Sequence, residues 1–231
     1  MSPSGAVIIG SGPSLRDVDM RLLAGRTTIA FNRSYIAWRE WGFDPTYYAC
    51  IDRNSLIDCA ADLRELVGRA RTRRFFLRDA YVDPALAAAE RVEWIRCSNQ
   101  MRFSTDLRSL GRYWNVAAVS VQILAALGHT RVVLVGVDGE FAPHATAVAL
   151  DEPWNLQSRG DDDPNHFTPA YHGAGRRFTR PNPEKFRKGW DALAAQLPAA
   201  GVEVVNASTR TALTQFPRLP LREALQWQDS R

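Results

Sequence analysis

The chain has 231 residues, of which 45% are hydrophobic and 23% charged, as in an ordinary globular protein. Its net charge of +4 comes almost wholly from arginine, because Lys185 and Lys188 are the only lysines. This mild, dispersed basicity favours anionic small molecules or a membrane surface over nucleic acid. Cys50, Cys59 and Cys97 contain no Cys-x-x-Cys pair, which argues against a disulfide framework and a zinc site. Without a leader or a long apolar run, we expect a cytoplasmic protein.

The first predicted strand covers residues 6–9 and ends in the loop Gly-Ser-Gly-Pro-Ser at 10–14. Glycines at 10 and 12 let backbone amides approach a phosphate closely. The dinucleotide fingerprint fails because Leu15 stands where its third glycine belongs, and the Gly-Lys-Ser/Thr of a P-loop is absent. Pro13 also removes one amide donor. The loop is therefore either a structural turn or a mononucleotide site.

Polar residues follow several predicted strands at the point where each strand ends. Asn32 follows a strand at 27–31, Asp52 follows one at 47–51, and Asp138 follows one at 131–137. Because ligands bind outside the carboxyl ends of parallel strands, we expect these side chains at one crevice. The remaining predicted strands cover 75–77, 92–95 and 202–205.

Helical patterns alternate with these strands. They cover residues 34–42, 54–70, 84–90, 116–127 and 183–197, with a short amphipathic helix around Trp227. Residues 97–114 are irregular and are interpreted as either a mobile lid or a variable connection. The alternation predicts one α/β domain over 1–231, with a doubly wound, mainly parallel Rossmann-like sheet of about seven strands.

Residues 139–180 form a long insertion without clear periodicity, rich in proline, glycine, aspartate and histidine. Loops of this length are usually functional lids or disordered, and this one is too aromatic for simple disorder. His166 and His172 flank Tyr171 within it. A histidine in a lid over a nucleotide crevice can act as a general base. The competing interpretation is a pair of surface-loop histidines.

Two charged groups lie close to these histidines. Asp161 and Asp163 fit the Asp-x-Asp pattern that holds a divalent metal in some sugar-nucleotide enzymes, or they belong to a solvated turn. Arg176 and Arg177 could clamp a phosphate or carboxylate, or form a solvated basic loop. No Gly-x-Ser-x-Gly elbow, His-Glu-x-x-His helix or catalytic cysteine pair supports a hydrolase.

The order of these motifs carries a family resemblance. Val-Ile-Ile-Gly-Ser-Gly-Pro-Ser-Leu opens the chain, and Phe-Asn-Arg, Leu-Gly-His, Val-Gly-Val-Asp and Asn-His-Phe follow in sequence. This arrangement resembles the bacterial sialyltransferases of glycosyltransferase family 42. It equally resembles a related family named after an archaeal 6-hydroxymethylpterin diphosphokinase, whose members also occur in flagellin glycosylation proteins. The likeness spans most of the chain, although residues 53–112 carry little of it.

The sialyltransferase resemblance implies transfer of a nonulosonic or ulosonic acid from a CMP-sugar to a glycan hydroxyl, inverting and without an essential metal. It implies a role in cell-surface polysaccharide biosynthesis and a loop histidine as base, with Tyr171 and the arginines beside the leaving phosphate. The implied nucleotide contacts are Gly10, Ser11, Gly12, Pro13, Ser14, Asn32, Asp52, Asn115 and Asp138.

This sequence departs from the family pattern at several of these positions. Ser11 and Asp52 stand where the family has asparagine, and the family's tyrosines just after the Gly-x-Asp strand are missing, which leaves Tyr171. Spacing does not decide whether His166 or His172 is the base.

Two other functions stay open. In the pterin diphosphokinase interpretation the crevice holds ATP and a pterin, and the cluster at 161–163 holds Mg²⁺. In the other, the chain is a nucleotide-binding module without catalysis. The expected partners are a nucleotide-sugar donor and a glycan acceptor. Self-association and a peripheral contact with the inner membrane also stay open.

Overall fold

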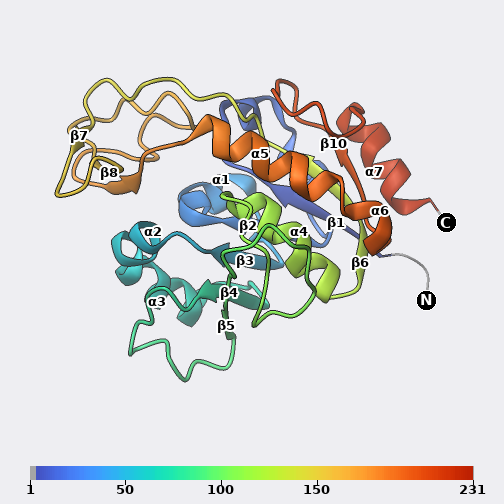
Figure 1. Cartoon of the computed structure of the whole chain (residues 1–231), viewed down its shortest axis with the longest axis horizontal. Coiled ribbons are helices and arrows are strands. Elements are labelled where there is room, and N and C mark those ends of the chain that lie inside the picture. The colour runs from blue at the N-terminus through green and yellow to red at the C-terminus, as the bar shows by residue number, and fades with distance from the viewer. Residues whose placement is uncertain (1–3, 231) are drawn as a thin grey trace.

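The computed structural model describes residues 4–230, and its centre is a seven-stranded sheet in which every pairing is parallel (Figure 1). The strands are β1 (Ser4–Ile9), β2 (Thr28–Phe31), β3 (Tyr47–Cys50), β4 (Arg74–Arg78), β5 (Val92–Ile95), β6 (His129–Val135) and β10 (Glu203–Asn206). Each overlaps a strand predicted from sequence. The predicted α/β, Rossmann-like fold class is therefore confirmed.

The strand order, β10-β6-β1-β2-β3-β4-β5, positions the site. From β1 the chain moves outward one strand at a time to β5, and then returns to place β6 on the other side of β1. Ligand crevices of open α/β sheets lie where the order reverses, outside the carboxyl ends of the strands. In this fold that point lies between the ends of β1 and β6.

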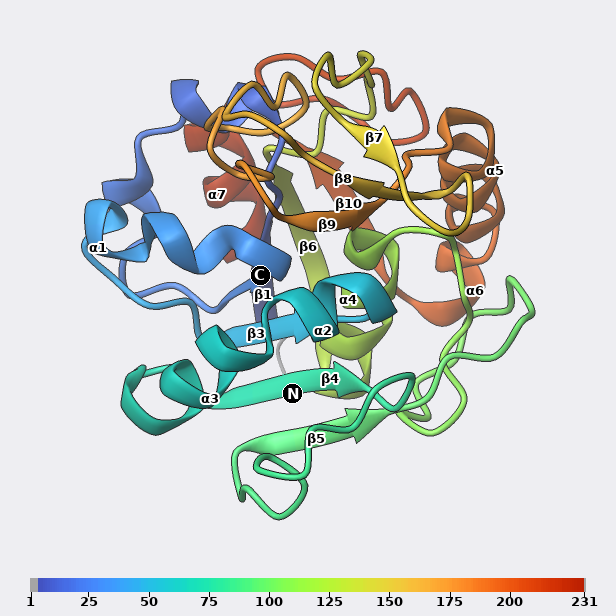
Figure 2. The same ribbon diagram turned by 90° about the vertical axis from the view of Figure 1, so that its left-hand side faces the viewer.

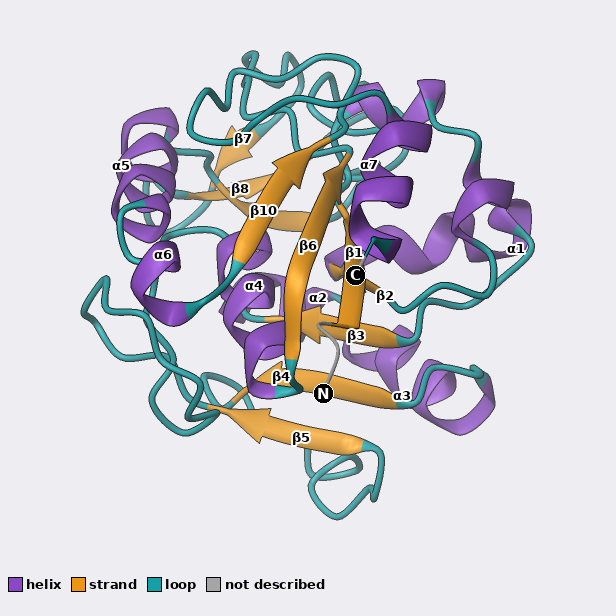
Figure 3. Ribbon diagram, turned by 90° about the vertical axis from the view of Figure 1, so that its right-hand side faces the viewer, coloured by secondary structure: helices purple, strands orange, loops and turns teal. Residues whose placement is uncertain are grey.

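Helices cover both faces of the sheet (Figure 3). Successive strand residues, such as Ile8 and Ile9, are both fully buried, and they pack against the helix layers on opposite faces of the sheet. One layer contains α4 (Val116–Ala126), α5 (Pro183–Ala194) and α6 (Leu197–Ala200). The other contains η1 (Pro13–Asp17), η2 (Met20–Leu23), η3 (Asn32–Ala37), α1 (Trp38–Trp41), α2 (Arg53–Asp58), α3 (Ala60–Arg69) and α7 (Leu221–Asp229).

Several helix predictions need correction. The helix predicted at 54–70 is interrupted at Cys59, and the one predicted at 183–197 is two helices. The segment 34–42 begins as the 3₁₀ helix η3 and only then becomes α1. The prediction of a helix at 84–90 was wrong. There the amides of Leu86 and Ala89 donate to carbonyls three residues back, which makes a run of turns.

The insertion at 139–180 contains a second sheet that the sequence did not predict. Its antiparallel strands are β7 (Val148–Ala149), β8 (Asn155–Gln157) and β9 (Arg177–Thr179). Strands of two or three residues are too short to show an alternating pattern. Figure 2 shows this small sheet beside the carboxyl ends of the central strands, next to α2. Among residues 4–230, no helix combines the length and apolar character needed to cross a membrane.

Candidate functional site

The carboxyl ends of β1 and β6 pack so closely that glycine is required between them. A Cβ at Gly10 would lie 2.1 Å from the carbonyl oxygen of Gly136. The amide of Gly10 donates to the Val135 carbonyl at 2.7 Å, and that of Gly12 to the Gly136 carbonyl at 2.8 Å. These two loop amides therefore bond within the protein, and the glycines serve strand packing.

Asp138 lies against the start of η1, on the other side of the same crevice. Its Oδ2 accepts from the Ser14 amide at 2.8 Å, and its Oδ1 accepts from the Ser14 hydroxyl. A Cβ at Gly12 would lie 2.6 Å from the Asp138 carboxyl carbon. Burial raises the pKa of Asp138, although the two bonds from Ser14 act in the opposite direction. An internal carboxylate thus takes up the Ser14 donors, which were expected to face a phosphate.

Asn32, directly after β2, has the features of a ligand contact. Its φ of 50° is in the left-handed region, where few residues other than glycine are found. Its carbonyl accepts from the Tyr48 hydroxyl at 2.6 Å, whereas its side-chain Oδ1 is buried without a hydrogen-bond partner. A strained backbone and an unsatisfied buried oxygen each cost free energy, and such costs concentrate at functional sites.

Two other predicted contacts are helix caps. Asp52 Oδ1 accepts from the Ser55 amide at 2.9 Å and caps α2, and its Oδ2 accepts from the Thr179 hydroxyl at 2.9 Å. Asn115 Oδ1 accepts from the Ala118 amide at 2.7 Å and caps α4. Both side chains therefore lie at the carboxyl edge of the sheet, but their acceptor oxygens are engaged within the protein.

The segment 163–172 of the insertion is seated directly on the opening loop. The Phe167 amide donates to the Ser11 carbonyl at 2.9 Å. Arg16 donates from Nε to the Phe167 carbonyl at 2.8 Å, and from Nη2 to the His166 carbonyl at 3.0 Å. The structure therefore brings the predicted lid and the predicted nucleotide loop together.

Tyr171 anchors the segment 163–172 to the loops after β1 and β2. Its side chain is buried, and its hydroxyl oxygen accepts from the Arg33 amide at 3.2 Å. The Arg33 guanidinium donates to the Tyr171 carbonyl, and the Tyr171 hydroxyl also hydrogen-bonds the side chain of Ser11. Burial raises the pKa of Tyr171 above its ordinary value, so the phenol stays protonated at neutral pH.

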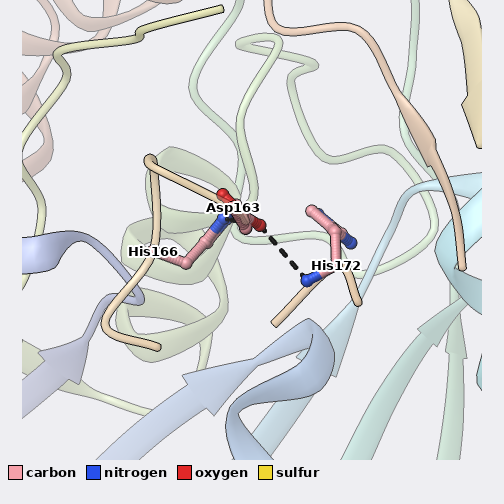
Figure 4. Close-up of side chains that lie close together, drawn as sticks. All are labelled: Asp163, His166 and His172. Carbon is pink, nitrogen blue, oxygen red and sulfur yellow. Dashed lines mark hydrogen bonds and ion pairs between the residues drawn. The ribbon is translucent and has the colours of Figure 1, made fainter. Parts of the chain in front are cut away.

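His166 and Asp163 form a hydrogen-bonded pair above Tyr171. His166 Nδ1 lies 2.8 Å from Asp163 Oδ2, and Figure 4 shows these two side chains next to each other, with His172 nearby. The imidazole of His166 stacks on the Tyr171 ring at 3.9 Å between centroids. Burial alone would raise the pKa of Asp163, but the hydrogen bond and charge of His166 bring it below its ordinary value. An ionised Asp163 can only accept, so Nδ1 is the ring nitrogen that donates to it, and Nε2 is the ring nitrogen that faces away from this hydrogen bond.

His172 is placed differently, although its amide also donates to Asp163 Oδ2, at 3.2 Å. Its ring stacks on Phe178 at 4.4 Å, and its Nδ1 is buried without a partner. Burial, reinforced by the charge of His166, holds the pKa of His172 well below its ordinary value. His144 packs on the same Phe178 ring at 5.4 Å, so three of the four histidines gather here.

Three side chains of this region have the spacing of metal ligands. Asp163, His166 and His172 each offer one ligand atom, and these atoms all lie within 4.8 Å of one another. Two imidazoles and a carboxylate suit a transition metal such as Zn²⁺ better than Mg²⁺. Asp161 is not in the group, and its Oδ1 accepts from the Ala174 amide at 2.9 Å.

The arginines predicted to clamp an anion have other partners. Arg176 lies 3.4 Å from Asp58 and 3.7 Å from Asp62. Arg177 is exposed on β9, and its amide donates to Asp58. Sequence reasoning missed Arg33, which is buried and has an Nε without a hydrogen-bond partner. Its position directly after Asn32, at the end of a predicted strand, is the sequence feature that could have identified Arg33 as a site residue.

Comparisons with known proteins bear on the fold. No protein-family model and no curated protein matches the sequence. Among solved structures, the chain is similar to the MAf glycosyltransferase from Magnetospirillum magneticum AMB-1, with a TM-score of 0.59 and 16% sequence identity. The similarity covers 99% of this chain and 37% of that one, so the chain spans well under half of its neighbour's length.

Proposed function

We propose that the protein is a glycosyltransferase that moves a nonulosonic or ulosonic acid from a CMP-sugar to a glycan hydroxyl. The observation that carries the proposal is the His166–Asp163 pair, held over the opening loop by the Phe167–Ser11 and Arg16 contacts. The structural neighbour is itself described as a glycosyltransferase, and the resemblance of the motif order points to a CMP-activated acidic sugar.

In the proposed step, His166 Nε2 takes the proton of the acceptor hydroxyl while that oxygen attacks the anomeric carbon. The bond from the anomeric carbon to the phosphate oxygen breaks, and CMP leaves with the electron pair, which inverts the anomeric centre. Asp163 stabilises the imidazolium that forms. Asn32, with its unpaired Oδ1, contacts the nucleotide, and Arg33 offsets charge on the departing phosphate in place of Arg176. No metal is required.

His166 is the better candidate for the base than His172. An orienting carboxylate on Nδ1 leaves Nε2 available, and the His166 side chain is 20% exposed. His172 is packed on Phe178. Its low pKa keeps it neutral but also makes it a weak base.

The phosphoryl-transfer alternative needs converging carboxylates for Mg²⁺. Asp161 accepts from the Ala174 amide, Asp162 accepts from the Thr146 hydroxyl at 2.6 Å, and Asp163 faces the histidines. Because the three carboxylates have separate partners, this geometry favours the glycosyl-transfer proposal.

Ligand-dependent thermal unfolding separates the candidates. The protein is heated with CMP, CDP, ATP or NAD, each with and without Mg²⁺. We expect CMP to raise the midpoint without metal, because a ligand that binds only the folded state stabilises it. A rise with ATP and Mg²⁺ alone would exclude the glycosyltransferase in favour of the kinase.

Catalysis is tested by release of CMP from CMP-N-acetylneuraminate and CMP-Kdo with a panel of glycan acceptors. We expect His166→Gln to abolish transfer and His172→Phe to retain most of it. CMP binding without turnover on either donor would support the non-catalytic module. Full activity of His166→Gln would show that another group is the base.

A further inference from the structure

Two arginines that the proposed mechanism does not use lie at the carboxyl edge, on the β3–β5 side. Arg78 is the last residue of β4, and its Nη1 lies 3.5 Å from the carbonyl oxygen of Ile51, just beyond β3. Arg112 lies on a segment that runs beside the chain leaving β5, because its amide donates to the Gln100 carbonyl at 3.0 Å. The two guanidinium groups are close enough to interact electrostatically.

Neither arginine has a neutralising partner among residues 4–230. No carboxylate lies within ion-pair distance of Arg78 or Arg112, and the Nε of Arg78 is buried without a hydrogen-bond acceptor. Asp52 is the nearby acid: its charge acts on Arg112 from beyond ion-pair distance, while its two oxygens accept from the Ser55 amide and the Thr179 hydroxyl. Burial, followed by the charge of Arg78, lowers the pKa of Arg112. Two partly buried like charges without a counter-ion are unfavourable in the free protein.

A third cation, Lys185, and a strained aromatic residue, Trp114, lie next to Arg112. The Arg112 guanidinium lies 4.4 Å from the centroid of the Trp114 ring, and Lys185 Nζ lies 4.5 Å from the same centroid. Trp114 is 42% exposed and has a φ of 58°, which strains a bulky residue. Lys185, too, forms no ion pair in the described part of the chain.

The surrounding structure holds the backbone on both sides of Arg112. The fully buried Gln122 accepts from the amides of Ser104 and Gly111 and donates to the Gly111 carbonyl at 2.9 Å. α5 packs against the other side, where a Cβ at Gly189 would lie 2.0 Å from the Tyr113 carbonyl oxygen. The segment 97–114 is therefore a fastened connection, and the backbone at Arg112 and Trp114 has a fixed place beside α5.

We propose that Arg78, Arg112 and Lys185 form an anion-binding subsite for a carboxylate or phosphate group of the substrate. Parallel strands are about 4.8 Å apart, so the end of β4 lies roughly 14 Å from the end of β1. A nucleotide-sugar held at the opening loop would direct its far end, or the acceptor bound beside it, toward this subsite. The identity of the substrate rests on the proposed function, whereas anion binding by the three cations does not.

The test measures the thermal unfolding midpoint of the whole chain against inorganic phosphate, at constant ionic strength set with NaCl. We expect phosphate to raise the midpoint of the wild type, and the rise to be lost in Arg78→Gln and in Arg112→Gln. Arg108→Gln is the matched control, because it removes one exposed charge from the same connection and should keep the rise. An equal response of all four proteins to phosphate would overturn the proposal.

The unfolding midpoint without phosphate distinguishes a variant that is destabilised from one that has only lost the subsite. Because each glutamine variant removes one of two unneutralised charges, we expect its midpoint without phosphate to equal or exceed that of the wild type. Arg112→Lys, which keeps the charge but loses the planar fork, should retain a weaker response. A lower midpoint of both glutamine variants without phosphate would contradict the absence of a counter-ion.

The source of the anion is distinguished by two nucleotides. If the donor supplies it, Arg112→Gln weakens binding of CMP-N-acetylneuraminate at least tenfold and leaves CMP binding unchanged. If the acceptor supplies it, both nucleotides bind the variant as they bind the wild type, while the phosphate response is still lost. Failure of the protein to bind either nucleotide would count against the proposed function alone.

Discussion

Ser14 donates both its backbone amide and its hydroxyl to the carboxylate of Asp138, which lies 124 residues further along the chain. The two residues join the loop after β1 to the segment after β6, at the point where the strand order reverses. The Gly10–Gly136 contact lies directly beneath them. The opening loop is therefore shaped first by the neighbouring strand, and the proposed nucleotide would bind on the surface that this packing creates.

The first prediction concerns Gly10. Gly10→Ala would place a Cβ 2.1 Å from a backbone oxygen, which cannot move without shifting β6, so we expect a loss of roughly 3 kcal/mol or more of unfolding free energy. Gly68→Ala is the control, because nothing lies within 4 Å of that Cβ in α3. Alanine there should stabilise the protein by about 0.5–1 kcal/mol. Urea denaturation measures both, and equal effects would contradict the packing argument.

The second prediction concerns the carboxylate that orients His166. Asp163→Asn keeps the shape of the side chain but no longer imposes the proton on Nδ1, so we expect the turnover number to fall about 100-fold or more, with a smaller change in KM. Asp161→Asn, which alters a cap on the Ala174 amide, should change turnover less than threefold. Equal losses in the two variants, measured by steady-state CMP release, would indicate a structural role for Asp163.

The third prediction is a pH dependence of stability. The pKa of His172 is lowered in the folded protein by burial and by His166, with Asp163 opposing and Arg33 and His144 adding to the shift. Below the ordinary value near 6.5, the unfolded chain therefore takes up a proton that the folded chain does not. The contribution of His172 to stability should be fully present above pH 6.5. Below that pH the free energy of unfolding should fall by up to about 1.4 kcal/mol per pH unit.

His172→Phe removes this titrating group while keeping a ring against Phe178. Its stability should change less than that of the wild type between pH 6.5 and 5. The pKa of Asp163 is also lowered, so its contribution is lost only below that carboxyl's ordinary range and does not enter this window. Parallel pH profiles of wild type and variant, from urea denaturation, would rule out His172 as the cause.

The fourth prediction separates strain from binding at Asn32. Glycine accepts the left-handed φ of 50° freely, so Asn32→Gly should leave unfolding free energy within about 1 kcal/mol of the wild type. The same change removes the unpaired Oδ1 and should weaken CMP binding about tenfold. Calorimetric titration with CMP checks this. Unchanged affinity in a stable Asn32→Gly protein would remove Asn32 from the nucleotide site.

The fifth prediction concerns transition metals. Zn²⁺ bound by Asp163, His166 and His172 would occupy the imidazole of His166, on which the proposed general-base catalysis depends. We expect Zn²⁺ to inhibit transfer and a chelator to restore it. His172→Phe should keep activity but lose sensitivity to Zn²⁺, because one ligand is gone. Stimulation by Zn²⁺ would instead assign the metal a catalytic role.

Much of the central sheet could be predicted from the sequence, because its buried parallel strands are apolar runs that end at polar residues. Asn32 and Asp138 were placed at the carboxyl edge in this way. The partners of those residues were not predictable, because they depend on which strand ends become neighbours. The sequence predicted that Arg176 binds a phosphate, whereas in the fold it pairs with Asp58. Arg33 is held by Tyr171, which is 138 residues away in the sequence.

The insertion is fastened to the rest of the chain at several places, two of which flank the proposed crevice. Its segment at 163–172 lies on the opening loop, whereas Thr179 on β9 donates to Asp52 at the start of α2. For the proposed nucleotide to leave from beneath the insertion, one of these contacts has to open. In the proposed transferase, departure of the spent nucleotide, and not bond breaking, would then limit turnover, and solvent viscosity would slow the reaction.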